Sequence, residues 1–149
     1  MTKGGMWAVA QMVLLAAVLA LGPVWSHEWA SAAATNCART LLIVSGAIAV
    51  CGFLTLGRNL TPQPKPRAQA TLIRHGVYSL VRHPLYLSLI LGSIGWAMFW
   101  RSLPALVLAA VLAFVLDAKA RVEEHWLSQR FPEYADYARR VRRFIPWIY

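Results

Sequence analysis

Long apolar stretches separated by short polar ones dominate this chain. The first stretch, Met6 to Trp25, contains one polar side chain, Gln11, and the second extends from Cys37 to Leu56. Each is close to the ~20 apolar residues that a helix needs to cross a bilayer. Lys3 before the first stretch would also suit a cleaved signal peptide, but the length of the stretch favours a permanent span. We therefore predict two transmembrane helices within residues 1–56, acting mainly as scaffold.

Two further apolar runs, Leu85–Trp100 and Leu103–Leu116, adjoin each other. As a single helix rising 1.5 Å per residue they would overshoot a hydrocarbon core of about 30 Å. The intervening Arg101-Ser102-Leu103-Pro104 supplies a charge and a helix breaker, so a helical hairpin is the better interpretation. The predicted fold is an all-α integral membrane protein with about four transmembrane helices, arranged as two hairpins with both termini on one side.

The remaining segments complete a single membrane domain spanning 1–149, in which 57–149 holds a loop, the second hairpin and C-terminal helices. The loop, 57–83, opens with three prolines at alternate positions between Thr61 and Pro66, a spacing that favours extended polyproline geometry. Pro132 is expected at the first position of a C-terminal helix. That amphipathic segment is predicted from apolar residues at three- or four-residue steps: Val122, Trp126, Phe131, Tyr134, Tyr137 or Ala138, Val141 and Ile145.

Charge indicates the orientation. The chain is 58% hydrophobic and 14% charged, with a net charge of +9 and a mean hydropathy of +0.49. Of the 15 Lys and Arg residues, all except Arg39 and Arg101 fall on one side of the predicted topology. By the positive-inside rule this side, which carries both termini and the 57–83 loop, is cytoplasmic. The basic excess is thus a topology signal, and we expect no nucleic-acid partner.

Cysteine and histidine add little chemistry. Cys37 and Cys51 lie too far apart along one predicted helix to form a disulfide, so we interpret them as packing residues. His75, His83 and His125 lack the i, i+4 spacing of paired metal ligands on a helix. We therefore expect no metal site.

The strongest candidate site combines Arg82-His83-Pro84-Leu85-Tyr86 with Glu123-Glu124. The predicted hairpin would return both clusters to the same membrane face. Pro84 is expected to be the first residue of its helix, which places Arg82 and His83 beside unpaired backbone N–H groups suited to an anion. Tyr78 and Tyr86 flank this corner. An arginine that simply reaches lipid phosphates is the alternative.

The two glutamates should project about 100° apart on a helix, so we expect only one to face an interior pocket. Lys119, four residues before Glu123, could pair with it on the surface. Glu124 is therefore the predicted inward residue. Two solvated carboxylates at the end of a span are the alternative.

Over residues 55–149 the chain resembles the isoprenylcysteine carboxyl methyltransferase family, which includes related small bacterial membrane methyltransferases and phospholipid methyltransferases. The resemblance rests on the order and spacing of many elements rather than on one motif. These are Thr61-Pro62, Pro64, Pro66, Leu72, Gly76-Val77-Tyr78, Arg82-His83-Pro84-Leu85-Tyr86, Glu123-Glu124, Leu127, Phe131, Tyr134, Tyr137, Val141 and Ile145-Pro146.

This resemblance implies an enzyme of the bacterial inner membrane that transfers a methyl group from S-adenosylmethionine. The acceptor would be membrane-borne or hydrophobic, a carboxylate, an amine or a thiol, and would arrive from the bilayer. Cofactor-binding residues would be Tyr78, Arg82, His83 and Tyr86 on one wall with Glu123 and Glu124 on the other. Arg82, His83 and Glu124 would also be catalytic.

Two departures from the family pattern concern the fit of the ligands. Ser88 stands where the family has glycine, which would narrow the space for cofactor or acceptor, and Phe131-Pro132 replaces Phe-Gly before the C-terminal tyrosines.

Other functions stay open. They are a non-catalytic scaffold or lipid-binding subunit, a nicotinamide-dependent membrane reductase and, least favoured because ionisable residues are lacking in the central runs, a transporter. The sequence does not indicate an oligomeric state.

Overall fold

The computed structural model describes residues 3–26, 31–57, 71–146 and 148. Within these ranges the chain is helical and contains no strand, only one isolated bridge between Val81 and Arg142. The predicted all-α class is therefore confirmed. The predicted proline-rich stretch Thr61–Pro66 lies outside the described residues. The elements in order are α1 (Lys3–Val24), α2 (Ala32–Leu56), the short 3₁₀ helix η2 (Gly76–Ser79), α3 (Pro84–Phe99), α4 (Leu103–Arg130) and α5 (Tyr134–Arg140).

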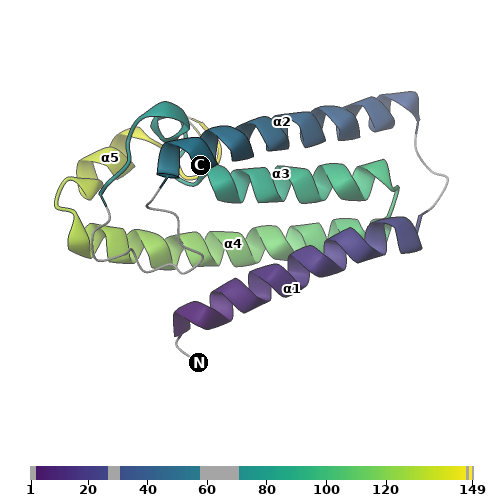
Figure 1. Cartoon of the computed structure of the whole chain (residues 1–149), viewed down its shortest axis with the longest axis horizontal. Coiled ribbons are helices and arrows are strands. Elements are labelled where there is room, and N and C mark those ends of the chain that lie inside the picture. The colour runs from purple at the N-terminus through teal and green to yellow at the C-terminus, as the bar shows by residue number, and fades with distance from the viewer. Residues whose placement is uncertain (1–2, 27–30, 58–70, 147, 149) are drawn as a thin grey trace.

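The long helices lie side by side in an elongated bundle (Figure 1). Helix α3 packs between α2 and α4, and α1 lies along the other side of α4. The α3–α4 hairpin has the predicted form. Helices α1 and α2 do not pack together as the predicted first hairpin. They lie on opposite sides of the α3–α4 hairpin, α1 along α4 and α2 along α3. Helix α5, the N-terminus of α1 and the start of α3 lie toward the same end of the bundle (Figure 1).

Among the described residues, three helices are long and apolar enough to cross a membrane: Gly5–Val24 within α1, α2, and α4. Large apolar side chains cover their outer faces, among them Ile43, Leu54 and Phe114, each more than 70% exposed. Such surfaces on long apolar helices are typical of proteins that contact lipid. Helix α3 is apolar but has 16 residues, about 24 Å of helix, which is short of a ~30 Å core. The fourth span therefore stays a prediction.

The turn between α3 and α4 follows from the residues that predicted it. Helix α3 ends at Phe99, and Arg101 adopts a left-handed conformation with φ of 56°. Ser102 then caps α4 by accepting a hydrogen bond from the Ala105 N–H at 3.4 Å. Pro104 lies in the first turn of α4, where the missing N–H costs nothing. The Ser102 hydroxyl also donates to the Leu21 carbonyl at 3.0 Å, which ties this turn to α1.

Close contact between α2 and α3 depends on small residues. A Cβ atom at Gly95 would lie 3.1 Å from the Ala38 carbonyl oxygen, so a side chain there would push the helices apart. Ser88 belongs to the same interface: its hydroxyl donates to the Leu85 carbonyl at 2.8 Å, and its own carbonyl accepts from the Ser45 hydroxyl at 2.8 Å. Ser88 is thus buried against α2. We expected it to narrow the space for a ligand, but it is not among the residues that line the cleft beside Arg82 and Glu123.

The C-terminal part differs from the prediction in two respects. Helix α4 continues beyond the apolar run that ends at Leu116 and reaches Arg130, and Pro132 lies in the turn before α5 rather than at the first position of that helix. Helix α5 also ends at Arg140, and Val141 is extended with φ of −114° and ψ of 131°. The amphipathic helix cannot continue to Ile145 because the chain after α5 pairs with the residues before α3.

Candidate functional site

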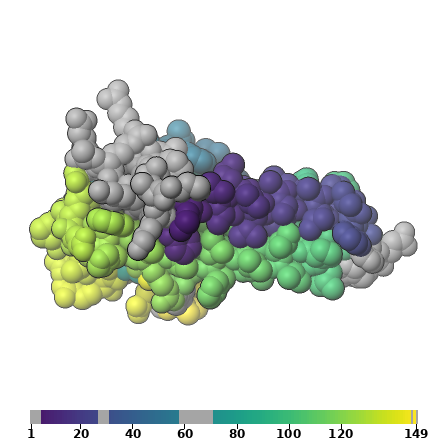
Figure 2. Space-filling view, turned by 90° about the horizontal axis from the view of Figure 1, so that it is seen from below, coloured from purple at the N-terminus to yellow at the C-terminus, as the bar shows by residue number. Residues whose placement is uncertain are grey.

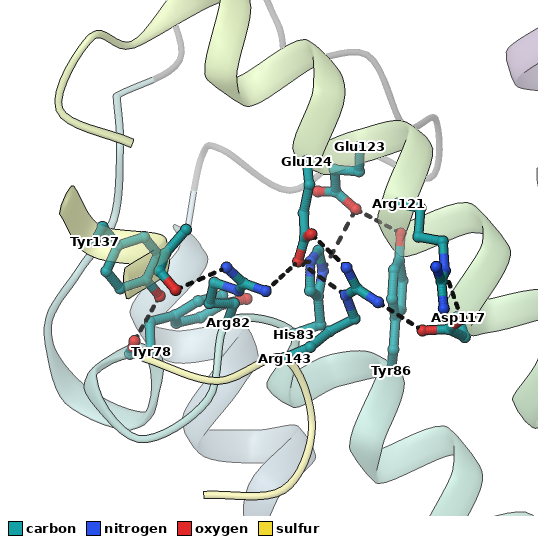
Figure 3. A network of polar contacts seen from close by, with 11 residues as sticks. Tyr78, Arg82, His83, Tyr86, Asp117, Arg121, Glu123, Glu124, Tyr137 and Arg143 are labelled. Atoms are coloured by element: carbon teal, nitrogen blue, oxygen red, sulfur yellow. Dashed lines mark hydrogen bonds and ion pairs between the residues drawn. The ribbon is translucent and has the colours of Figure 1, made fainter. Parts of the chain in front are cut away.

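The candidate site lies where α3 begins and α4 nears its end, beside α5 and the chain that follows it (Figure 3). Pro84 is the first residue of α3, as predicted, and His83 occupies the N-cap position without a capping hydrogen bond from its side chain. The α3–α4 hairpin places this corner against the last part of α4. Arg82 and Glu124, which lie far apart in the sequence, consequently form an ion pair with their atoms 3.1 Å apart.

Glu124 is the centre of this cluster, and its side chain is 13% exposed. Its carboxylate contacts Arg82 and also His83 Nε2 at 3.1 Å. Arg143 donates to both of its oxygens, from Nε at 3.0 Å and Nη2 at 2.7 Å (Figure 3). Three potentially cationic side chains around one carboxylate can compensate the cost of burying it.

Glu123 also reaches the site: among the described residues it lines the neighbouring cleft, whereas Glu124, the glutamate expected to face inward, does not. Its Oε2 accepts a hydrogen bond from the Tyr86 hydroxyl at 2.8 Å and lies 3.7 Å from His83 Nδ1. Adjacent positions on α4 straddle the His83 ring, and each glutamate is long enough to contact one ring nitrogen. The predicted surface pair with Lys119 does not form, since Lys119 is buried.

The backbone N–H groups of Arg82 and His83, which precede α3, are occupied by the chain that follows α5. The N–H groups of Arg82 and His83 donate to the carbonyls of Arg142 and Arg143 at 2.8 and 3.2 Å. The Arg82 side chain also donates from Nη1 to the Ala138 carbonyl at 3.2 Å. The segment after α5 is thus held against the Arg82-His83 corner by main-chain and side-chain bonds.

Tyrosines form the apolar part of the site. The rings of His83 and Tyr86 stack at a centroid distance of 5.3 Å. The Tyr137 hydroxyl donates to the Tyr78 carbonyl at 2.6 Å. Burial raises the pKa of Tyr78, Tyr134 and Tyr137 well above the ordinary value, and nearby carboxylates raise it further. These phenols therefore stay neutral at physiological pH.

A cleft of about 70 Å³ opens beside the cluster. Within the described part of the chain it is lined by Leu56, Tyr78, Arg82, His83, Leu85, Tyr86 and Glu123. It thus combines a guanidinium, a carboxylate and aromatic rings in a partly apolar wall. Among the described residues, Arg82 Nε and the Tyr134 hydroxyl are buried without a hydrogen-bond partner. Unsatisfied donors beside a cleft are typical of sites that bind a polar ligand.

The sequence placed the cationic and anionic residues on opposite walls of a cofactor pocket, whereas the structure has them in direct contact through Arg82 and Glu124. It also missed Arg143, whose side chain bridges Glu124 and Asp117, the latter at 2.9 Å from Nη1. The hydrogen bonds to Glu124 and Asp117 raise the pKa of Arg143, so the bridge is permanently charged. Its sequence signal was hidden, because any C-terminal arginine also fits the positive-inside pattern.

Comparison with known proteins shows the family of this chain. The sequence model of the phospholipid methyltransferase family matches residues 34–134, more than half of the chain, and the protein therefore belongs to this family of membrane methyltransferases. With its long apolar helices, this membership indicates an integral membrane protein.

Individual relatives are of two kinds. The chain is 35% identical over 144 residues to the nickel-cobalt-cadmium resistance protein NccN of Alcaligenes xylosoxydans xylosoxydans, which covers 95% of this chain and 63% of that protein. It is similarly 35% identical to the cobalt-zinc-cadmium resistance protein CzcN of Cupriavidus metallidurans, over 95% of this chain and 62% of that protein. Protein-S-isoprenylcysteine O-methyltransferase B of Arabidopsis thaliana is 30% identical over 126 residues, 82% of this chain and 62% of that enzyme. The chain thus spans somewhat less than two thirds of the relatives it matches.

Proposed function

We propose that this protein is an S-adenosylmethionine-dependent methyltransferase of the membrane, acting on a lipophilic acceptor at the cytoplasmic face. Family membership supports the reaction class. The observation that carries the proposal is the cleft itself, in which Arg82, His83, Tyr86 and Glu123 converge from the beginning of α3 and the end of α4. A cation, an anion and aromatic faces are therefore available to a ligand that carries charges of both signs.

The residues fit the charges of this cofactor. Arg82, with its unpartnered Nε, suits the carboxylate, and Glu123 suits the ammonium group. The rings of Tyr78 and Tyr86 suit the sulfonium through cation–π attraction. When bound, the cofactor supplies an activated methyl group. The present cleft of about 70 Å³ is smaller than the 300–1,000 Å³ usual for ligand pockets, so we infer that binding widens it.

The chain's own groups would then orient and shield the reactants. Glu124 fixes Arg82 and the His83 ring, and the apolar residues Leu56 and Leu85 exclude water from the cleft wall. A carboxylate acceptor needs no base. An amine acceptor must lose a proton, which His83 Nε2 or Nδ1, each facing a glutamate, could accept.

Cofactor binding by calorimetry on the detergent-purified protein tests this directly. We expect micromolar binding, weakened at least about tenfold in Arg82→Ala and Glu123→Gln. Arg139→Ala and Glu133→Gln are matched controls, because both side chains are exposed, and should bind like the wild type. Circular dichroism would establish that each variant is folded.

No binding by the folded wild type, in detergent and again in lipid nanodiscs, would sink the methyltransferase proposal. A non-catalytic scaffold or lipid-binding subunit would then lead, and binding of reduced nicotinamide cofactor instead would favour a membrane reductase. If binding is found, transfer of a labelled methyl group to extracted lipids, apolar carboxylic acids, amines and thiols would identify the acceptor.

We also propose that four helices cross the bacterial inner membrane with both termini cytoplasmic. The common location of the N-terminus of α1, the start of α3 and α5 at one end of the bundle supports this arrangement. Single cysteines introduced at Arg139 and at Arg101 in a Cys37→Ser, Cys51→Ser background should be labelled from opposite sides by an impermeant maleimide. Labelling of both from the same side would contradict the four-span topology.

Similarity to two metal-resistance proteins over nearly all of this chain suggests a cellular role under metal stress. We propose that methyl transfer, rather than a different reaction, underlies this role. Expression of the wild type, but not of Arg82→Ala, should then raise the cobalt or cadmium tolerance of a sensitive host. Equal protection by both proteins would separate resistance from the candidate site.

A further inference from the structure

A lysine is buried where three helices meet behind the candidate site. Lys119 on α4 is only 2% exposed. Its Nζ donates to the Gln11 amide oxygen on α1 at 2.7 Å and lies 5.1 Å from the centroid of the Tyr86 ring on α3. Figures 1 and 2 show α1 lying along α4, which brings Gln11 to this position. A single ammonium group thus links the first helix to a wall of the cleft.

Lys119 has no carboxylate partner within ion-pair distance in the described part of the chain. Burial of an ammonium group is costly unless its environment compensates, and a methionine would pack with similar volume at no such cost. A neutral amide, a ring face and the more distant charge of Glu123 are modest compensation. An ionisable residue retained within a membrane helix bundle therefore points to a functional rather than a packing role.

The contacts of Tyr86 suggest what that role is. Its ring stacks on His83 and is contacted by Lys119, while its hydroxyl donates to Glu123 at 2.8 Å. Tyr86 and Glu123 both line the cleft, whereas Lys119 does not. Attraction between an ammonium group and an aromatic face is strong when both are removed from water. Lys119 therefore acts on the cleft from behind, through the orientation of one aromatic ring.

We propose that Lys119, held by Gln11, is a positioning residue that fixes Tyr86 and, through its hydroxyl, the Glu123 carboxylate of the cleft. Helix α1 is then part of the site rather than a passive scaffold. The consequence for ligand affinity rests on the proposed cofactor function. The effect on Tyr86 itself does not.

The test uses the full-length protein labelled with 3-fluorotyrosine, which introduces a fluorine at five tyrosines. The Tyr86 fluorine resonance is assigned by its loss in Tyr86→Phe. Lys119→Met removes the charge and keeps the volume, and Gln11→Leu removes the amide that holds it. Leu112→Met, on the same helix and equally buried, is the matched control.

We expect the Tyr86 resonance to shift and broaden in Lys119→Met without ligand, to shift less in Gln11→Leu, and to stay unchanged in Leu112→Met. Cofactor affinity should fall about tenfold in Lys119→Met, equivalent to about 1.4 kcal/mol, and Lys119→Arg should restore part of it. An unmoved Tyr86 resonance in folded Lys119→Met would overturn the proposal. If that variant does not fold, an unmoved resonance in Gln11→Leu would do so.

The two proposals fail in distinguishable ways. A shifted Tyr86 resonance in a protein that binds no cofactor would retain the positioning role and reject the methyltransferase function. Normal cofactor binding with an unmoved Tyr86 resonance would retain the methyltransferase function and reject the positioning role of Lys119.

Discussion

Arg143 should hold the C-terminal segment against the candidate site. Its side chain joins Glu124 and Asp117 of α4 through three charge-assisted hydrogen bonds of 2.7, 3.0 and 2.9 Å. Next to it, the carbonyls of Arg142 and Arg143 accept hydrogen bonds from the N–H groups of Arg82 and His83. Arg143→Ala should therefore release this segment and expose those two amides to solvent.

The expected magnitude follows from the contacts. A hydrogen bond to a charged group contributes about 1.5–3 kcal/mol. The three bonds of Arg143 are not independent, and Glu124 would keep Arg82 and His83 as partners. Because the Arg143 side chain is 14% exposed, water can replace part of what is lost. We therefore expect the opening free energy of the segment to fall by about 3 kcal/mol, which corresponds to roughly 100-fold faster exchange at about 1.4 kcal/mol per tenfold.

Hydrogen exchange of the Arg82 and His83 amides measures this opening directly. Arg142→Ala is the matched control, since it removes the same charge from the adjacent, exposed position. Arg143→Lys should give an intermediate rate because it keeps the charge but loses the two-point contact with Glu124. Equal exchange in Arg143→Ala and Arg142→Ala would refute the view that the Arg143 side chain holds the segment.

Three further predictions concern stability in detergent. Tyr137→Phe should lower the free energy of unfolding by about 1–3 kcal/mol, because the buried Tyr78 carbonyl loses its hydroxyl donor. Tyr134→Phe should change this free energy little, because the Tyr134 hydroxyl has no partner among the described residues. Chemical denaturation measures both, and equal losses would contradict this reasoning. Raised phenol pKa values mean that the folded state keeps protons which the unfolded state releases. The unfolding free energy should thus be steady below about pH 10 and fall above it, by up to about 1.4 kcal/mol per pH unit for each tyrosine, and a flat profile would exclude the effect. Gly95→Leu should destabilise the α2–α3 contact and lower the melting temperature. Gly46→Ala should leave it unchanged, because a Cβ atom there meets nothing within 4 Å. Equal melting temperatures of the two variants would count against tight packing at Gly95.

Local signals in the sequence were sufficient for the ends of several elements. Pro84 and Pro104 each carry no N–H, which suits only the first turn of a helix, and both lie where this predicts. Pro132 gave the same signal and is not helical, because Glu133 caps α5 instead. A proline restricts its own backbone angle but does not determine which neighbouring residue begins the hydrogen-bonded turns.

Convergence of Arg82 and His83 on Glu124 was predictable because a hairpin of two helices must bring its ends together. The residues that pair with Arg82 and His83 from the C-terminal segment were not predictable. Pairing of Arg82 and His83 with the chain at Arg142 and Arg143 uses backbone atoms, which every sequence has, so no residue type announces it. The convergence did not show whether Arg82 and Glu124 contact each other directly or face each other across a pocket, because complementary charges fit both arrangements equally well.

Residues that support the site come from both sides of the region that defines the family. The match extends over 34–134, whereas Gln11 precedes it and Arg143 follows it. Gln11 holds Lys119 behind Tyr86, and Arg143 binds the Glu124 carboxylate, which Arg82 also contacts. A fragment limited to the matched region would therefore keep the cleft residues but lose Gln11 and Arg143, the partners of Lys119 and Glu124. The family core supplies the groups that line the cleft, and the flanking segments are needed to hold those groups in place.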